Sequence, residues 1–155
     1  MIDLLTVEEA KKLPKKIRMC DVPKKFDGYI FNNKCWWWLR SPGYFSTYAA
    51  VVVASGAVGE YCNFVFDDFS AVRPVIRVTE NIDDMEETKD GFIRYLGTKW
   101  INITEYIGTT CLLKKKCLKN PHRFDAKSND YEKSEIKKYL EDWYKLRQEK
   151  YGKEE

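Results

Sequence analysis

Three consecutive tryptophans constrain the fold of this chain more than any other feature. The run W-W-W-L-R-S-P-G begins at Trp36. Side chains of a strand alternate between its two faces, so three adjacent indoles cannot share one face. We therefore expect a strand with Trp37 and Leu39 on one face, and with both faces covered. The opposite face would carry Trp36, Trp38 and Arg40, and the proline and glycine that follow favour a turn that ends the strand.

Length and composition fit a single folded domain. The chain has 155 residues, of which 44% are hydrophobic and 15% aromatic, which is enough apolar material for a core and argues against disorder. No stretch approaches the roughly 18 to 20 apolar residues of a membrane helix. The first apolar residues run into the charged pair Glu8-Glu9, which is not the pattern of a signal peptide. We expect one cytoplasmic domain over residues 1–155 that does not bind a membrane.

The cysteines predict free thiols. The chain contains five of them: Cys20, Cys35, Cys62, Cys111 and Cys117. None forms a C-x-x-C pair, which fits a reducing compartment and offers no paired ligands for zinc. The single histidine, His122, stands in a basic run, and no motif ties it to a nucleophile. We expect no catalytic residues, no metal and no cofactor.

The N-terminal segment predicts a short helix. Thr6 and Glu9 have the spacing of a capping box, so a helix from Val7 to Leu13 is expected, and Pro14 would end it. Residues 15–25 are basic and favour a loop or an edge strand.

A hairpin and a closing strand are expected after the tryptophans. Residues 49–54 and 57–62 are rich in small and β-branched side chains, and Ser55-Gly56 between them favours a two-residue turn. That turn places Val53 opposite Val58 and Val51 opposite Glu60. Residues 72–78 are expected to form the closing strand, with its proline at a bulge or an edge.

An acidic segment separates two basic parts of the chain. The net charge is +3 over residues 1–78, −5 over residues 79–91 and +5 over residues 92–155. The acidic segment has the composition of an exposed connector. Beyond it the sequence predicts a strand, a turn and a second strand over residues 92–103 and a third strand at 111–113. An amphipathic helix is expected from Ser134 onward.

Three parts of the chain together resemble a bacterial and phage domain family of unknown function. They are the WWLRSPG run at residues 37–43, the hairpin, and the strand V-R-P-V-I-R-V at residues 72–78. Their order is also similar to C-type-lectin-like domains, including the formylglycine-generating type. The resemblance implies an α+β, C-type-lectin-like single domain with a mainly antiparallel twisted sheet, a short N-terminal helix and a longer C-terminal helix. The reactive cysteine pair of the formylglycine-generating type is missing between Cys62 and Val78, so the resemblance implies no enzyme.

The order of the segments departs from that family. In its members a segment like residues 92–140, with a tryptophan at the position of Trp100, usually stands before the WWLRSPG part, whereas here it follows. This order resembles a circular permutation in which residues 79–91 join neighbouring strands. A chain cut from tandem copies is the alternative.

The loops around the tryptophan strand favour protein binding. Tyrosine-rich polar loops provide rigid contact area at low entropic cost. The expected contact residues are Tyr44, Phe45, Tyr48, Glu60 and Tyr61. The alternative is that these aromatic rings cover the tryptophans as part of the core. We expect a non-enzymatic binding module, and the family's usual setting suggests a phage or mobile-element protein that blocks a host factor.

Nucleic-acid binding is the alternative function. It would use the basic residues within 11–25 and those within 114–123. The second group consists of Lys114, Lys115, Lys116, Lys119 and Arg123. Phosphate contacts would make the affinity fall steeply with salt.

Two arginines are expected to have structural roles. Arg40 and Arg73 stand in apolar surroundings, and an unpaired buried charge is costly, so each needs partners. Asp67 and Asp68 are the nearest candidates. The residues expected to be structural are Trp36, Trp37, Trp38, Arg40, Arg73 and Trp100.

Overall fold

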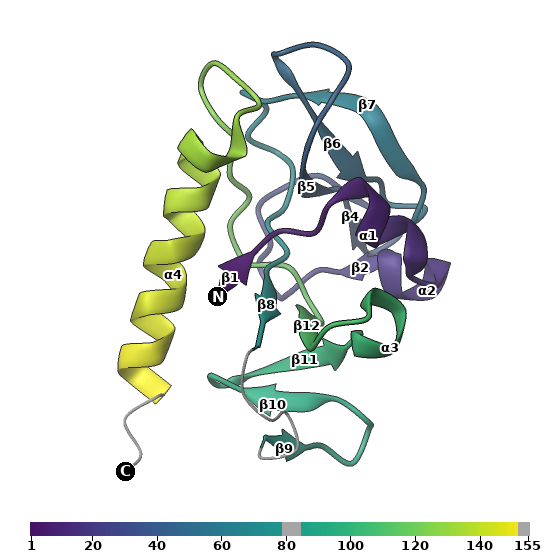
Figure 1. The fold of residues 1–155 in the computed structure, drawn as a ribbon, viewed down its shortest axis with the longest axis vertical. Coiled ribbons are helices and arrows are strands. Elements are labelled where there is room, and N and C mark those ends of the chain that lie inside the picture. The colour runs from purple at the N-terminus through teal and green to yellow at the C-terminus, as the bar shows by residue number, and fades with distance from the viewer. Residues whose placement is uncertain (79–84, 152–155) are drawn as a thin grey trace.

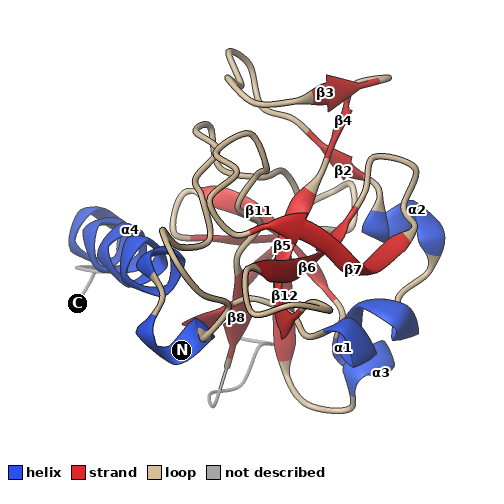
Figure 2. Ribbon diagram, turned by 90° about the horizontal axis from the view of Figure 1, so that it is seen from above, coloured by secondary structure: helices blue, strands red, loops and turns tan. Residues whose placement is uncertain are grey.

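Helices flank the strands on two sides in the computed structural model, which describes residues 1–78 and 85–151. The described helices are α1 (Val7–Lys12), α2 (Lys15–Arg18), α3 (Thr104–Ile107), the 3-10 turn η2 (Tyr131–Lys133) and α4 (Glu135–Tyr151). The long helix α4 lies on one side of the strands and α1 to α3 lie on the other (Figures 1 and 2). The fold is therefore α+β, as expected. Among the described helices, none is long and apolar enough to span a bilayer.

The largest sheet joins both ends of the sequence. Its antiparallel strands follow the order β1-β8-β12-β11-β10-β9. They are β1 (Ile2–Asp3), β8 (Val75–Arg77), β12 (Cys111–Lys114), β11 (Thr98–Asn102), β10 (Ile93–Tyr95) and β9 (Glu86–Glu87). All four side chains of β12 are buried at the centre of the sheet. The expected strands at residues 92–103 and 111–113 are confirmed, and the C-terminal helix is confirmed as α4.

Two smaller antiparallel sheets complete the described part of the fold. One has the order β5-β6-β7 and the other β2-β4-β3. Their strands are β5 (Trp37–Pro42), β6 (Tyr48–Val52), β7 (Val58–Phe64), β2 (Cys20–Asp21), β4 (Lys34–Cys35) and β3 (Ile30–Phe31). Strand β5 is the tryptophan strand.

The two faces of β5 belong to different parts of the core. Trp37 and Leu39 pack in one buried cluster, which also contains side chains of α1 and β12. Trp38 packs in the other cluster with Trp100 and with residues of α4, and Trp36 lies at its margin. The expected alternation of side chains along the tryptophan strand is therefore confirmed, and both faces are covered.

The capping box of α1 is confirmed, whereas the segment after it differs from the expectation. The Thr6 hydroxyl accepts from the Glu9 amide, and the Glu9 carboxylate accepts from the Thr6 amide. Residues 15–18 form α2, where the sequence favoured a loop or an edge strand, whereas residues 20–21 of the same segment form the edge strand β2. Pro14 ends α1 because it has no N–H to donate, but its fixed φ, here −58°, suits the residue that starts the next helix.

The register of the β6–β7 hairpin is one residue away from the expected one. Val52 pairs with Val58 and Val51 with Gly59, so the predicted pairings of Val53 and of Val51 are wrong. The Val53 amide donates to the Ala57 carbonyl across a three-residue loop, in which Gly56 has a φ of +89°. Glycine adopts this left-handed conformation without a steric penalty, which favours the longer loop over a two-residue turn.

The closing strand and the connector also differ from the prediction. Strand β8 covers residues 75–77 rather than 72–78, because Pro74 cannot donate a ladder hydrogen bond. Upstream of it, Ala71 makes an isolated parallel bridge with Trp37. Residues 86–87 of the expected connector are exposed, as predicted, but they form the edge strand β9. Residues 79–84 of that connector lie outside the described residues.

Candidate functional site

Six aromatic side chains form a continuous series of ring contacts on and beside β6 and β7. In order of contact they are Tyr61, Tyr44, Phe45, Tyr48, Phe64 and Phe66. Neighbouring ring centroids lie 4.6 to 6.1 Å apart. Five of the six side chains are 46 to 70% exposed. We call this set the aromatic surface.

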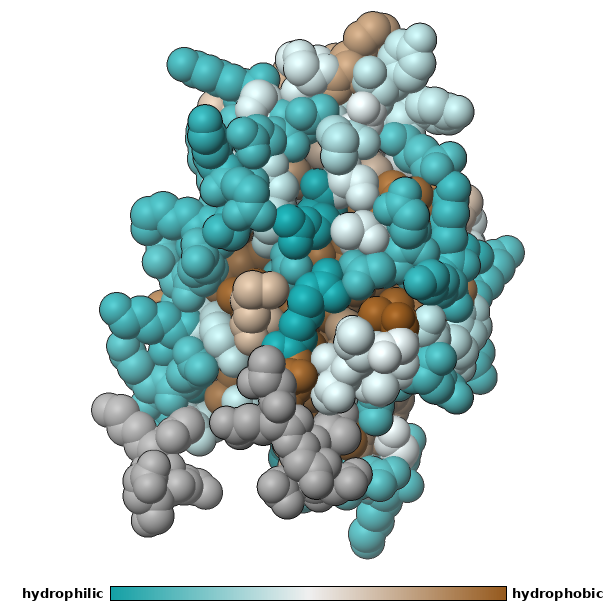
Figure 3. Space-filling model, viewed as in Figure 1, coloured by the Kyte–Doolittle hydropathy of each residue, from teal (hydrophilic) through white to brown (hydrophobic). Residues whose placement is uncertain are grey.

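Hydrogen bonds hold the loop that carries part of the aromatic surface. The amide of Tyr48 donates to the Phe45 carbonyl, and the amide of Gly43 donates to the Tyr48 carbonyl. The side-chain amide of Asn129 donates to the carbonyls of Phe45 and Tyr48 at 3.1 and 3.0 Å. At Gly43, a Cβ atom would stand 2.7 Å from the Cβ of Tyr48, so glycine is needed for this close approach. In Figure 3, hydrophobic atoms are exposed at the tip of this loop among hydrophilic neighbours.

An acidic hollow includes Asn63 and Asp67, which are neighbours of Phe64 and Phe66 in the sequence. It has a volume of about 650 Å³ and is lined by Asp27, Gly28, Tyr29, Trp36, Asn63, Asp67, Phe69 and Ser70. Tyr29 meets Trp36 edge-on, with the ring centroids 6.0 Å apart. Asp67 accepts hydrogen bonds from the side chains of Asn63 and Ser70. The hollow thus combines three aromatic rings with two carboxylates.

This composition suits a cation. A positive group over an aromatic face is attracted by the ring quadrupole, and a carboxylate beside it adds charge attraction. Asp27 is exposed, and within the described residues no hydrogen bond or ion pair engages its carboxylate. Lysine or arginine from another molecule would meet both requirements of the hollow.

Four of the five residues predicted to bind belong to the aromatic surface. Tyr44, Phe45 and Tyr61 are exposed, so the alternative that they form part of the core is wrong. Glu60 is separate from the rings, because its carboxylate accepts from the Lys11 ammonium at 2.6 Å. Phe64 and Phe66 also belong to the aromatic surface but were not predicted from the sequence. Their signal was the alternation around buried Val65, which places both phenylalanines on one side of the chain.

The basic residues predicted within 114–123 differ in exposure and in partners. Lys114 is buried and donates to the Lys116 carbonyl, whereas Arg123 pairs with Glu135 at 2.7 Å. What the structure does bring together is a hollow of about 320 Å³ lined by Pro23, Arg94, Gly97, Thr98, Lys99, Lys114, Lys115 and Lys116. Within it, Lys99 already pairs with Asp90.

Burial lowers the pKa of Lys114 to about 8. Because the folded pKa lies below that of the unfolded chain, charging Lys114 costs stability, and this cost is relieved as the pH rises from about 8 towards 10.5. We compare the free energy of unfolding of the natural chain with that of Lys114→Met. Relative to the variant, the natural chain is expected to become more stable by about 2 kcal/mol between pH 7 and pH 9.5, at 1.36 kcal/mol per unit of pKa shift. Urea unfolding at both pH values measures this gain, and a constant difference between the two proteins contradicts it.

The two structural arginines have other partners than predicted. Arg40 pairs with Asp3 and Glu132. The Arg73 guanidinium, 1% exposed, donates to the carbonyls of Ile17, Lys114 and Lys115 and lies 4.9 Å from the Trp37 ring. Neither contacts Asp67 or Asp68, because Asp67 instead closes its own turn by accepting from the Phe69 amide. Both guanidinium groups are thus held by contacts within the protein.

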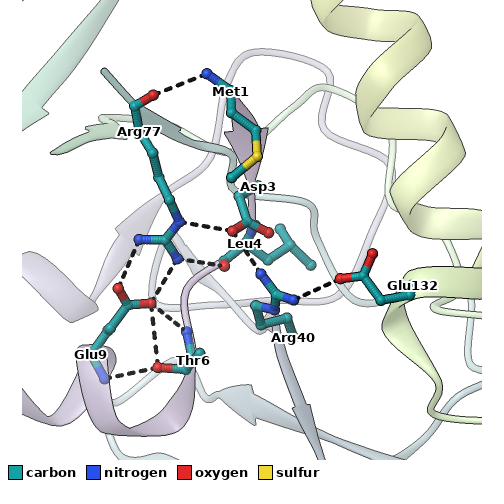
Figure 4. A network of polar contacts seen from close by, with 8 residues as sticks. All are labelled: Met1, Asp3, Leu4, Thr6, Glu9, Arg40, Arg77 and Glu132. Atoms are coloured by element: carbon teal, nitrogen blue, oxygen red, sulfur yellow. Dashed lines mark hydrogen bonds and ion pairs between the residues drawn. The ribbon is translucent and has the colours of Figure 1, made fainter. Parts of the chain in front are cut away.

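A buried carboxylate connects three segments that are distant in sequence. The Asp3 carboxylate accepts from Arg40, Arg77 and the Leu4 amide, each at 2.8 to 2.9 Å (Figure 4). Arg77 also donates to both carboxylate oxygens of Glu9. These contacts join β1 to β5, β8 and α1, and so hold the tryptophan strand against the large sheet.

Comparison with family models, with curated proteins and with solved structures finds no match to this chain. The resemblance to the WWLRSPG family and the circular permutation remain predictions from the sequence.

Proposed function

We propose that this chain is a non-enzymatic protein-binding module that uses the aromatic surface. The observation that carries the proposal is the unbroken series of six rings, five of them well exposed to solvent. Exposed aromatic clusters of this kind are rare on monomers without a binding role, because their hydration is unfavourable. Tyrosine and phenylalanine contribute large contact areas when a partner covers them.

The rigidity of the loop supports the same proposal. Its hydrogen bonds to Asn129 fix the backbone at Phe45 and Tyr48 before any partner arrives. A partner then loses less free energy to ordering the interface. The ring contacts within the surface restrict the side chains in the same way.

The acidic hollow defines the chemistry of the partner. Tyr29, Trp36 and Phe69 offer ring surface to a cation, and Asp27 offers an uncompensated carboxylate. We infer that the partner presents a lysine or arginine side chain to the hollow and an apolar segment to the aromatic surface. We also propose that the domain has a C-type-lectin-like architecture, which is supported by the order of tryptophan strand, hairpin and arginine-bearing strand. The proposed role is to block a host factor.

A peptide-display selection tests the proposal. We expect enriched peptides to combine lysine or arginine with aromatic or aliphatic residues. Their affinity is expected to fall by about a hundredfold on Tyr44→Ala/Tyr61→Ala, because each lost anchor costs about 1–2 kcal/mol. Leu146→Ala is the matched control, since Leu146 is similarly exposed, at 65%, but lies on α4. Peptides that bind the double variant as tightly as the natural chain would contradict the proposal.

Nucleic-acid binding stays the second candidate because of the basic hollow beside β10 and β11. Arg94 and Lys116 are exposed there and are free to contact phosphates. Binding of this kind would weaken steeply with salt, and Arg94→Gln/Lys116→Gln would reduce that slope by about two, one for each lost phosphate contact. An affinity that hardly responds to salt and to this double variant would exclude it.

A further inference from the structure

Three cysteines that are distant in sequence meet inside the protein. The sulfur atoms of Cys20, Cys35 and Cys117 all lie within 4.8 Å of one another. Cys20 and Cys35 are directly paired across β2 and β4. Cys117 follows β12 and is held beside β2 by a bridge between Asp21 and Lys116. Three separate elements thus deliver one sulfur each to the same point.

These sulfurs are enclosed by protein. Cys20 and Cys35 have no exposed surface, and Cys117 is 1% exposed. Two cationic side chains, Arg73 and Lys114, are also buried nearby, at 1 and 9% exposure. Arg73 donates to main-chain carbonyls only, within the described residues, so no carboxylate balances its charge. A buried cation without an anion is costly, and an anionic sulfur cluster would remove that cost.

Hydrogen bonds to main-chain carbonyls hold two of the three sulfurs. The Cys20 thiol donates to the Asp21 carbonyl at 3.4 Å, and the Cys35 thiol donates to the Cys20 carbonyl at 3.7 Å. The positions of these sulfurs are therefore fixed by the backbone of β2.

We propose that Cys20, Cys35 and Cys117 form a buried three-sulfur site for a soft metal ion, namely monovalent copper. Thiolates prefer soft ions. An equilateral triangle with sides of 4.8 Å has its centre about 2.8 Å from each corner, so a contraction of about 0.5 Å reaches a metal–sulfur bond of about 2.3 Å. Binding of the ion displaces the three thiol protons, which are released to solvent.

Ligand number and charge decide between copper and zinc. Structural zinc takes four protein ligands, and within the described residues no histidine, aspartate or glutamate joins the three sulfurs. Monovalent copper accepts three thiolates in a trigonal arrangement. Three thiolates and one monovalent ion leave two negative charges, which Arg73 and Lys114 neutralise. The site is then electrically balanced within the core.

Titration of the reduced chain with monovalent copper under anaerobic conditions, against a chromogenic copper chelator, tests the proposal. We expect one equivalent to bind, with three sulfur ligands in the X-ray absorption spectrum. Cys117→Ala is expected to weaken binding by more than about a hundredfold, because even groups outside the ligand sphere are worth roughly 10- to 100-fold. Cys111→Ala is the matched control: this cysteine is buried on β12 but lies outside the cluster.

Thermal unfolding provides one further readout. Copper is expected to raise the thermal midpoint of the natural chain and of Cys111→Ala, and to raise that of Cys117→Ala by clearly less, because stabilisation of the native state grows with its affinity for the ion. The absorption spectrum needs no variant, so it applies even if Cys117→Ala fails to fold. Fewer than three sulfur ligands, an equal loss of affinity in Cys111→Ala, or tight four-coordinate zinc binding in place of copper would overturn the proposal.

Discussion

Asp3→Ala is expected to lower the free energy of unfolding by about 3–5 kcal/mol, which is the cost of breaking a buried ion pair from one side. Asp3 is 2% exposed and accepts at 2.8 Å from both Arg40 and Arg77. Its removal leaves two partly buried guanidinium groups without their shared anion. It also removes the acceptor of the Leu4 amide. The loss is large because one carboxylate satisfies three donors.

Urea unfolding of Asp3→Ala measures this loss, and two further variants control it. Asp142→Ala breaks an exposed pair with Lys138 on α4 and is expected to cost less than about 0.5 kcal/mol. Asp3→Asn keeps an acceptor for the Leu4 amide but removes the charge, so it separates the ionic part of the loss from the rest. A cost for Asp3→Ala similar to that of Asp142→Ala would show that the network does not hold β1 in place.

Local patterns made part of the fold predictable. The capping box at Thr6 and Glu9 depends on residues three apart, and the alternation along β5 depends on adjacent side chains. Strand β1 is a two-residue element, too short to show a periodic pattern, and its partner Arg77 lies 74 residues away from Asp3. Such pairings are determined by tertiary packing, which a pass along the sequence does not reveal.

The same distinction applies to the candidate sites. Tyr44, Phe45 and Tyr48 are close in sequence, so a loop rich in aromatic residues was recognisable. The acidic hollow was not recognisable in this way, because Asp27 and Tyr29 lie far in sequence from Asn63 and Phe69, which line the same hollow. The three sulfurs come from positions 20, 35 and 117, and their spacing has no metal-binding signature. Sequence spacing reveals a ligand set only when neighbouring residues on one element supply it.

Trp38→Ala is expected to destabilise the protein by about 3–5 kcal/mol, the usual cost of removing a large buried aromatic side chain. Trp38 has no exposed surface, and its ring meets Phe124 at 5.6 Å between centroids. Its indole N–H donates to the His122 carbonyl at 2.8 Å. The variant therefore loses both the packing and the partner of a partly buried carbonyl.

Comparing Trp36 with Trp38, which pack in the same cluster, tests the difference in burial between them. Trp36 is only partly buried and touches Tyr29 at the edge of the acidic hollow, so Trp36→Ala is expected to cost about 1–2 kcal/mol, in proportion to its smaller buried area. Trp38→Phe keeps most of the ring but removes the indole N–H, and is expected to cost an intermediate amount. Urea unfolding ranks the three variants. A greater loss of stability for Trp36→Ala than for Trp38→Ala would show that Trp36, and not Trp38, is the more deeply buried tryptophan. Trp36 could then not line an exposed acidic hollow.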